Sequence, residues 1–129
     1  MSIRVVRLGS PRDPKEGLRV GTVRRPPRGV KKGDYASRDF FDAWMPELAP
    51  RVDLVSWALS EPFTPARWSR YEKAYRSQMK QPPARRLISL LAALSHQTNF
   101  SVGCYCADET KCHRSILRDL LGDAGANLE

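Results

Sequence analysis

Near its end the chain passes from an alternating apolar segment, through a cysteine-rich loop, into an amphipathic segment. Phe100, Val102 and Cys104 alternate as the side chains on one face of a β-strand do. Four apolar residues then recur at helical spacing: Ile116, Leu117, Leu120 and Leu121. All three cysteines, one of the two histidines and an arginine lie between Cys104 and Arg114. A strand-to-helix junction with reactive side chains predicts an α/β protein with a ligand site at this loop.

Upstream of this junction the sequence predicts strands first and helices afterwards. We expect strands at 3–8, 18–23 and 44–48, and helices at 38–43, 50–59, from Thr64-Pro65 onward, and around 87–94. We therefore predict a compact three-layer α/β domain with a small, mostly parallel sheet flanked by helices. At this length residues 1–129 are expected to form a single domain.

Composition restricts the class of protein. Hydrophobic residues make up 41% of the chain, which is typical of a globular protein. No apolar run approaches the roughly 20 residues that span a bilayer, and the N-terminal residues do not resemble a secretory signal. Three clustered cysteines, an odd number, do not make the disulfide framework of a secreted domain. We expect a cytoplasmic protein without a membrane partner.

The positive charge is concentrated in the first quarter of the chain. Residues 1–34 hold ten Lys or Arg and three Asp or Glu, a net charge of +7 out of the total of +8. From Arg19 to Lys32 there are six cations and no acid. Such a segment attracts phosphate, a nucleotide or nucleic acid, or it is only a solvated face that keeps the protein soluble.

The helix expected from about Cys112 offers a second group of anion-binding donors. Its first turn has unpaired N–H groups, and Arg114 and Ser115 add side-chain donors. Arg114 shares a helical row with Arg118 and is expected to lean towards solvent or a ligand. We predict a small anionic, nucleotide-like ligand held by six residues: Arg24, Arg28, Lys31, Lys32, Arg114 and Ser115.

The cysteines allow three other interpretations, and the residues leave them open. Cys106 or Cys112 could act as a nucleophile with His113 as proton carrier. Cys104, Cys106, Cys112 and His113 could hold a metal or form a redox sensor, although the usual strong zinc spacing is absent. The cysteines could also be small core residues. The basic segment at 19–32 suggests a nucleic-acid-binding module as the main alternative function. The residues identify neither a cofactor nor an enzymatic reaction.

Several short motifs, in this order along the chain, resemble the YeaO-like family, domain of unknown function 488, of bacteria and archaea. The similar segments are Arg24 with Pro27–Lys32, Asp42-Ala43-Trp44 with Pro50, Phe63–Tyr75 with Trp68 and Tyr71, and Cys112-His113-Arg114. The last of these looks like the broader relatives, in which Cys-His-Arg opens the final helix. The resemblance implies an α/β sandwich-like fold, and it brings no established activity, substrate or cofactor.

Overall fold

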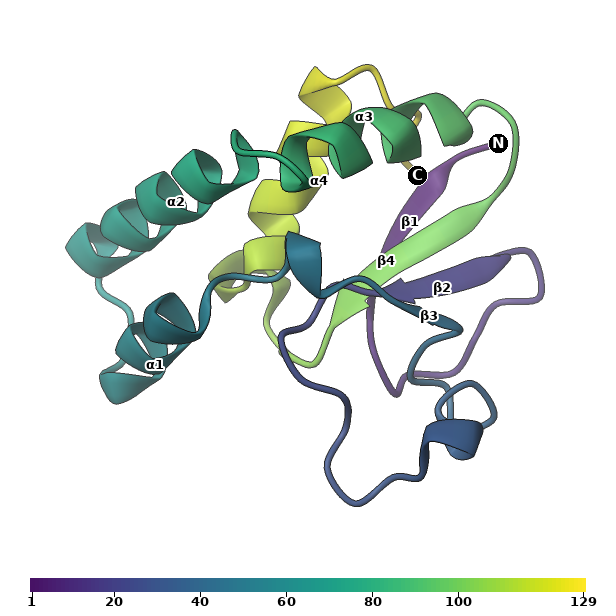
Figure 1. Cartoon of the computed structure of the whole chain (residues 1–129), viewed down its shortest axis with the longest axis horizontal. Coiled ribbons are helices and arrows are strands. Elements are labelled where there is room, and N and C mark those ends of the chain that lie inside the picture. The colour runs from purple at the N-terminus through teal and green to yellow at the C-terminus, as the bar shows by residue number, and fades with distance from the viewer.

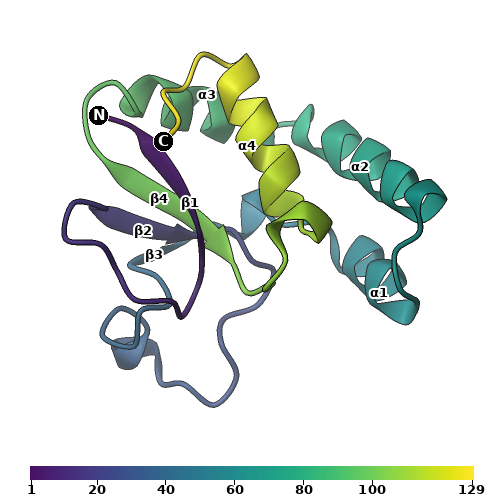
Figure 2. The same cartoon turned by 180° about the vertical axis from the view of Figure 1, so that it is seen from behind.

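The computed structural model describes all residues 1–129, and a four-stranded sheet forms its centre (Figures 1 and 2). Every neighbouring pair of strands in this sheet is parallel. The strands are β1 (Ile3–Arg7), β2 (Leu18–Gly21), β3 (Ala43–Trp44) and β4 (Phe100–Cys104), in the spatial order β1-β4-β2-β3. The predicted α/β fold with a small parallel sheet is confirmed.

β4 lies between β1 and β2 although it comes last in the sequence. Val102 pairs with Val5 on one side and with Val20 on the other, and every residue of β4 is buried. Because the three strands are parallel, their carboxyl ends meet at one edge of the sheet. The cysteine-rich loop and the basic segment after β2 both leave the sheet at this edge, which is where ligands bind in open α/β folds.

The structure has four α-helices. Three of them lie between β3 and β4 in the chain, and the fourth follows β4. They are α1 (Val52–Ser60), α2 (Pro65–Met79), α3 (Ala84–Leu94) and α4 (His113–Asp123). The predicted start of α2 is confirmed, because the Thr64 side chain accepts a hydrogen bond from the Arg67 backbone N–H at 3.2 Å. None of these helices combines the length and the apolar character that crossing a membrane would require.

Two local predictions are wrong. Residues 38–42 form turns, bends and irregular chain rather than a helix, Ala43 begins β3, and Asp39 has a positive φ of 62° that interrupts helical geometry. Of the strand expected at 44–48, only Trp44 lies in a strand, β3, and Pro46–Leu48 is a 3₁₀ helix. The helix expected around 87–94 is confirmed as part of α3, which presents Ile88 and Leu91 to the core and leaves Leu90 58% exposed.

The two faces of the sheet are covered differently. On one face, Val20, Phe100 and Val102 pack with helical residues such as Tyr75 and Leu117 in the main apolar core. On the other face, loops take the place of helices (Figure 1). There Phe41 sits against Gly21, and Leu8 sits within 2.9 Å of where a Cβ on Gly103 would be. Glycine is needed at both strand positions, because Phe41 leaves no room for a Cβ on Gly21 and the Val6 carbonyl oxygen of β1, with Leu8, leaves none on Gly103.

Arg19 is buried on the loop-covered face, which corrects the expectation that it belongs to an exposed cationic segment. Its side chain is 1% exposed, and its Nε donates to the Glu16 carboxylate at 2.7 Å. Nη1 donates to the carbonyl oxygens of Ser10 and Asp39, both at 2.8 Å. Ser101, in β4, donates to the same Glu16 carboxylate. Glu16 and Arg19 therefore form a buried, fully hydrogen-bonded ion pair between loop and sheet.

This ion pair predicts a loss of stability in acid. Burial alone would raise the pKa of the Glu16 carboxyl, but the hydrogen bonds from Arg19 and Ser101 lower it below its ordinary value of 4.5. Because the unfolded chain then binds this proton more readily, the contribution is present above about pH 4.5 and is lost as the pH falls below it. Urea denaturation from pH 7 to pH 3 should show this loss. The Glu16→Gln variant should have a flatter pH profile, and an unchanged slope would contradict the assignment.

Candidate functional site

The cysteine-rich loop connects the central strand to the last helix, as the sequence predicts. β4 ends at Cys104, a 3₁₀ turn covers Glu109–Lys111, and Cys112 immediately precedes α4. The loop is fixed internally by Asp108, whose carboxylate accepts hydrogen bonds from the Thr110 N–H at 3.0 Å and hydroxyl at 2.6 Å. The same bonds lower the pKa of Asp108. The loop therefore has a defined shape between two buried elements.

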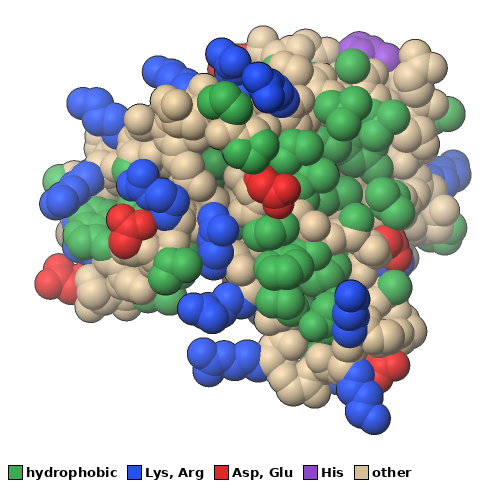
Figure 3. Space-filling model, viewed as in Figure 1, with side chains coloured by type: hydrophobic (Ala, Val, Ile, Leu, Met, Phe, Trp, Pro, Cys, Tyr) green, Lys and Arg blue, Asp and Glu red, His purple; other side chains and the backbone are tan.

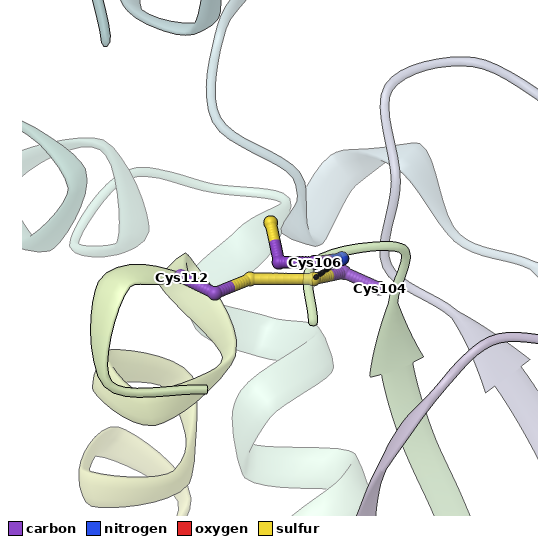
Figure 4. Close-up of side chains that lie close together, drawn as sticks. All are labelled: Cys104, Cys106 and Cys112. Carbon is purple, nitrogen blue, oxygen red and sulfur yellow. Dashed lines mark hydrogen bonds between the residues drawn. A yellow bond between two sulfur atoms is a disulfide. The ribbon is translucent and has the colours of Figure 1, made fainter. Parts of the chain in front are cut away.

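The loop brings the sulfur atoms of all three cysteines together (Figure 4). They lie within 4.8 Å of one another. Cys104 and Cys112 are buried and joined as a disulfide, whereas Cys106 is exposed and free. Cys104 and Cys112 also belong to a small apolar cluster with Leu8 and Phe41. Two of the cysteines thus fill a core position, and Cys106 is the only free thiol.

His113 opens α4 and is held in one tautomer. Its Nε2 is 2.7 Å from the backbone carbonyl oxygen of Thr22, so Nε2–H is the donor and Nδ1 keeps its lone pair. Nδ1 faces the Cys112 sulfur at 3.7 Å. The pKa of His113 is lowered to about 4. Burial is the main cause, and the charge of Arg114 adds to it, whereas the hydrogen bond to the Thr22 carbonyl opposes the shift. His113 is therefore neutral near pH 7.

Arg114 is buried, contrary to the expectation that it leans towards solvent. Its side chain is 4% exposed, and Nε and Nη1 are completely buried without any hydrogen-bond partner. Its charge acts on the loop: burial raises the pKa of the Cys106 thiol, and Arg114 opposes that rise. Arg118, one turn later, is half-buried and donates to the Glu129 carbonyl oxygen at 2.6 Å. Of the two arginines in this helical row, only Arg114 carries an unpaired buried charge.

A cleft of about 770 Å³ opens beside the loop. Its walls come from the segment after β2, from α1 and α2, and from the loop itself. Figure 3 shows the hydrophobic side chains of this face next to a hollow that Lys and Arg side chains border. Four cations line the cleft, and no acidic residue does: Arg24, Arg25, Arg28 and Lys111. The cleft is therefore apolar inside, with an excess of positive charge at its walls.

A model of the Active DUF488-N3 subclade, DUF488-N3a, matches residues 3–125. The chain belongs to the DUF488-N3a family. This match confirms the resemblance to DUF488 and YeaO-like proteins, and it includes both the basic segment after β2 and Cys112-His113-Arg114. No curated protein and no solved structure matches the chain.

In this DUF488-N3a chain most of the predicted site residues lie at or near the cleft. Arg24 and Arg28 line it together with three residues of the loop: Cys106, Cys112 and His113. Arg24 is already occupied, because it donates to the carbonyl oxygens of Ala49 at 3.0 Å and Pro50 at 3.1 Å. Arg114 is not among the lining residues, and it acts on the cleft through the charge felt by Cys106 and His113.

Besides Arg114, three predicted ligand residues of the DUF488-N3a chain do not contribute to the cleft walls. Lys31 and Lys32 are exposed at the start of the 3₁₀ turn Lys32–Asp34, away from the lining. The Ser115 hydroxyl donates to the Cys112 carbonyl oxygen at 2.9 Å. Ser115 is therefore engaged in the first turn of α4 rather than free for a ligand.

Sequence reasoning missed several lining residues. Tyr71 lies on the buried face of α2, and it also lines the cleft. Burial raises the pKa of its hydroxyl, while the backbone N–H of His113 opposes that rise, so the hydroxyl lies at the start of α4. Tyr105 reaches across the cleft, where its hydroxyl donates to the Arg25 carbonyl oxygen at 2.9 Å. The position of Tyr105 between two cysteines was the available signal.

Proposed function

We propose that this cleft binds a small anionic ligand, with a phosphorylated, nucleotide-like molecule as the preferred class. One observation carries the proposal: positive charge gathers at the cleft without an opposing charge. Four cations and no carboxylate line it, and the nearby Arg114 guanidinium has two buried donors without acceptors.

The unpaired state of Arg114 gives an anion a large energetic reason to bind. Taking one charge out of water without a partner costs several kcal/mol, and an arriving anion would recover part of that cost. Arg114 also sits in the first turn of α4, where backbone N–H groups and the helix dipole favour negative charge. The two effects act at the same end of the same helix.

The apolar walls favour a ligand with a flat, apolar body over a simple inorganic anion. Phe40, Phe63, Tyr71 and Tyr105 all contribute to the lining. Aromatic side chains stack on nucleobases, and each such contact is worth about 1–3 kcal/mol. A nucleotide would place its base among these rings and its phosphate towards Arg28 and the start of α4.

The catalytic roles predicted for Cys106, Cys112 and His113 stay predictions. Cys106 is the free thiol at the cleft and is the better candidate nucleophile. Cys112 becomes available only when its bond to Cys104 is reduced. His113 keeps an Nδ1 lone pair facing Cys112, which is the geometry of a proton acceptor for that thiol.

Titration calorimetry with adenosine monophosphate and with inorganic phosphate tests the proposal. Arg114→Gln is expected to weaken binding roughly tenfold, which is about 1.4 kcal/mol, because it removes the unpaired positive charge beside the cleft. Arg118→Gln is the matched control: it removes the same charge one turn further along α4, and its affinity should stay near that of the wild type. Equal affinities for Arg114→Gln and the wild type would reject the proposal.

Nucleic acid is the alternative partner, and the structure reduces the surface available to it. Arg19 is buried and Arg24 is bonded to carbonyls, so the exposed cations are Arg25, Arg28, Lys31 and Lys32. A single-stranded oligonucleotide titrated at increasing salt separates the two ideas, since backbone binding weakens steeply as salt rises. Tight oligonucleotide binding with a steep salt slope and no mononucleotide binding would favour the nucleic-acid function.

A further inference from the structure

The three cysteines form a cluster that an anion site does not need. Their sulfur atoms are mutually within 4.8 Å, although Cys104 ends β4 and Cys112 precedes α4 (Figure 4). Cys106 approaches the other two from the exposed side of the loop. Three convergent sulfurs from two rigid elements and one short loop are more than a single disulfide requires.

The backbone positions suit shared coordination of one ion. The Cα atoms of Cys104 and Cys112 are 7.9 Å apart, wider than the roughly 4.4–6.8 Å of most disulfides. With Zn–S bonds of about 2.3 Å, sulfurs in a tetrahedral site lie about 3.8 Å apart. Small rotations of the side chains bring sulfurs that are within 4.8 Å to that spacing. The cluster is thus close to the dimensions of a thiolate metal site.

His113 supplies a fourth donor next to the Cys112 sulfur. Its Nδ1 is 3.7 Å from the Cys112 sulfur and carries a free lone pair, while its Nε2–H donates to the Thr22 carbonyl oxygen at 2.7 Å. Metal-bound histidines almost always donate their second nitrogen in this way, because the bond fixes the ring and its tautomer. The ring is therefore oriented as a ligand before any ion arrives.

We propose that the reduced protein binds one thiophilic divalent cation of the Zn²⁺ type through the sulfurs of Cys104, Cys106 and Cys112, with His113 Nδ1 as fourth ligand. A thiol or phosphine reductant first supplies two electrons and two protons to the Cys104–Cys112 bond. Binding then releases the thiol protons to the buffer and transfers no electrons. Three thiolates and one Zn²⁺ leave a net charge of −1, so the neighbouring Arg114 does not repel the occupied site.

This site shares Cys106, Cys112 and His113 with the wall of the proposed ligand cleft, and it has a structural consequence of its own. An ion held by β4, the loop and α4 would fix the loop against the start of the helix. Soft sulfur ligands with one imidazole select Zn²⁺ over Mg²⁺ or Ca²⁺, which prefer oxygen ligands. We therefore expect Zn²⁺ and Co²⁺ to bind and Mg²⁺ to have no effect.

The test uses the full chain, reduced with a phosphine and kept anaerobic, titrated with Zn²⁺ against a chromogenic chelator and with Co²⁺ by absorption. We expect one ion per chain and a thiolate-to-cobalt charge-transfer band. Cys106→Ser is the informative variant because Cys106 is exposed and free, so its loss leaves the core intact. Its affinity should fall at least about tenfold, given that even outer partners of metal ligands contribute 10- to 100-fold.

Two further variants sharpen the result. Ala107→Ser changes an exposed side chain in the same loop and should bind like the wild type. His113→Gln keeps a donor for the Thr22 carbonyl and lacks the Nδ1 ligand, so it should bind Co²⁺ with an altered spectrum. A folded, reduced wild type with three freely alkylated thiols and no bound ion would overturn the proposal, as would wild-type affinity in Cys106→Ser. Refolding of a reduced, unfolded chain on addition of Zn²⁺ would support it.

Discussion

Replacing Glu16 with alanine is expected to lower the free energy of unfolding by about 3–5 kcal/mol, the usual cost of removing one partner from a buried ion pair. The carboxylate binds the Arg19 guanidinium through both oxygens, at 2.7 and 2.9 Å, and both side chains are almost fully buried. Without Glu16 the Arg19 charge keeps its two carbonyl acceptors but loses its counter-charge. Urea denaturation monitored by circular dichroism measures the difference.

Two controls make this expectation specific to the buried pair. Glu72→Ala breaks the pair with Arg76 on α2, which has a similar distance of 2.9 Å but leaves each side chain about a third exposed, and it should cost less than about 1 kcal/mol. The double variant Glu16→Ala with Arg19→Met removes both charges and should recover much of the lost stability. If Glu16→Ala and Glu72→Ala cost the same, the Glu16–Arg19 pair does not hold the loop to the sheet.

The same pair shows why the sequence predicts the strands better than their surroundings. In Leu18–Gly21 the alternation correctly identifies a strand and places Val20 in the core. The same alternation places Arg19 on the opposite face of the strand. A cation there leads the sequence pattern to predict that this face is exposed to solvent. That face is covered by loops whose Glu16 is separated from Ser101 by most of the chain. A local sequence pattern cannot predict that distant loops bury this face of the sheet.

For the candidate site, the sequence predicts which segments lie together, but it does not predict which side chains are exposed or what they contact. Parallel strand ends share an edge, so the Cys104–Arg114 loop and the segment with Arg28 could be placed together from the sequence. The turn at Lys32–Asp34 carries Lys31 and Lys32 away from the cleft, and no motif signals its direction. The burial of Arg114 was missed because helical rows describe one helix and do not show what covers it.

Replacing Arg114 with methionine is expected to raise the stability of the ligand-free protein by at least about 1 kcal/mol, since a buried charge without a partner opposes folding. Nearly all other substitutions of buried residues destabilise, so the sign itself is informative. Nε and Nη1 of Arg114 have no acceptor, and methionine fills a similar volume without polar atoms. Thermal unfolding in chelator and without phosphate gives the comparison.

Arg118→Met is the matched control for this result, because Arg118 lies one turn along α4 and is only half-buried. Its stability should stay within about 0.5 kcal/mol of the wild type. Added phosphate or nucleotide should stabilise the wild type more than Arg114→Met. The ligand should therefore reduce or reverse the difference in stability between the two proteins. A destabilised Arg114→Met in ligand-free solution would mean that the guanidinium has an internal acceptor, and the charge argument for an anion at the start of α4 would fail with it.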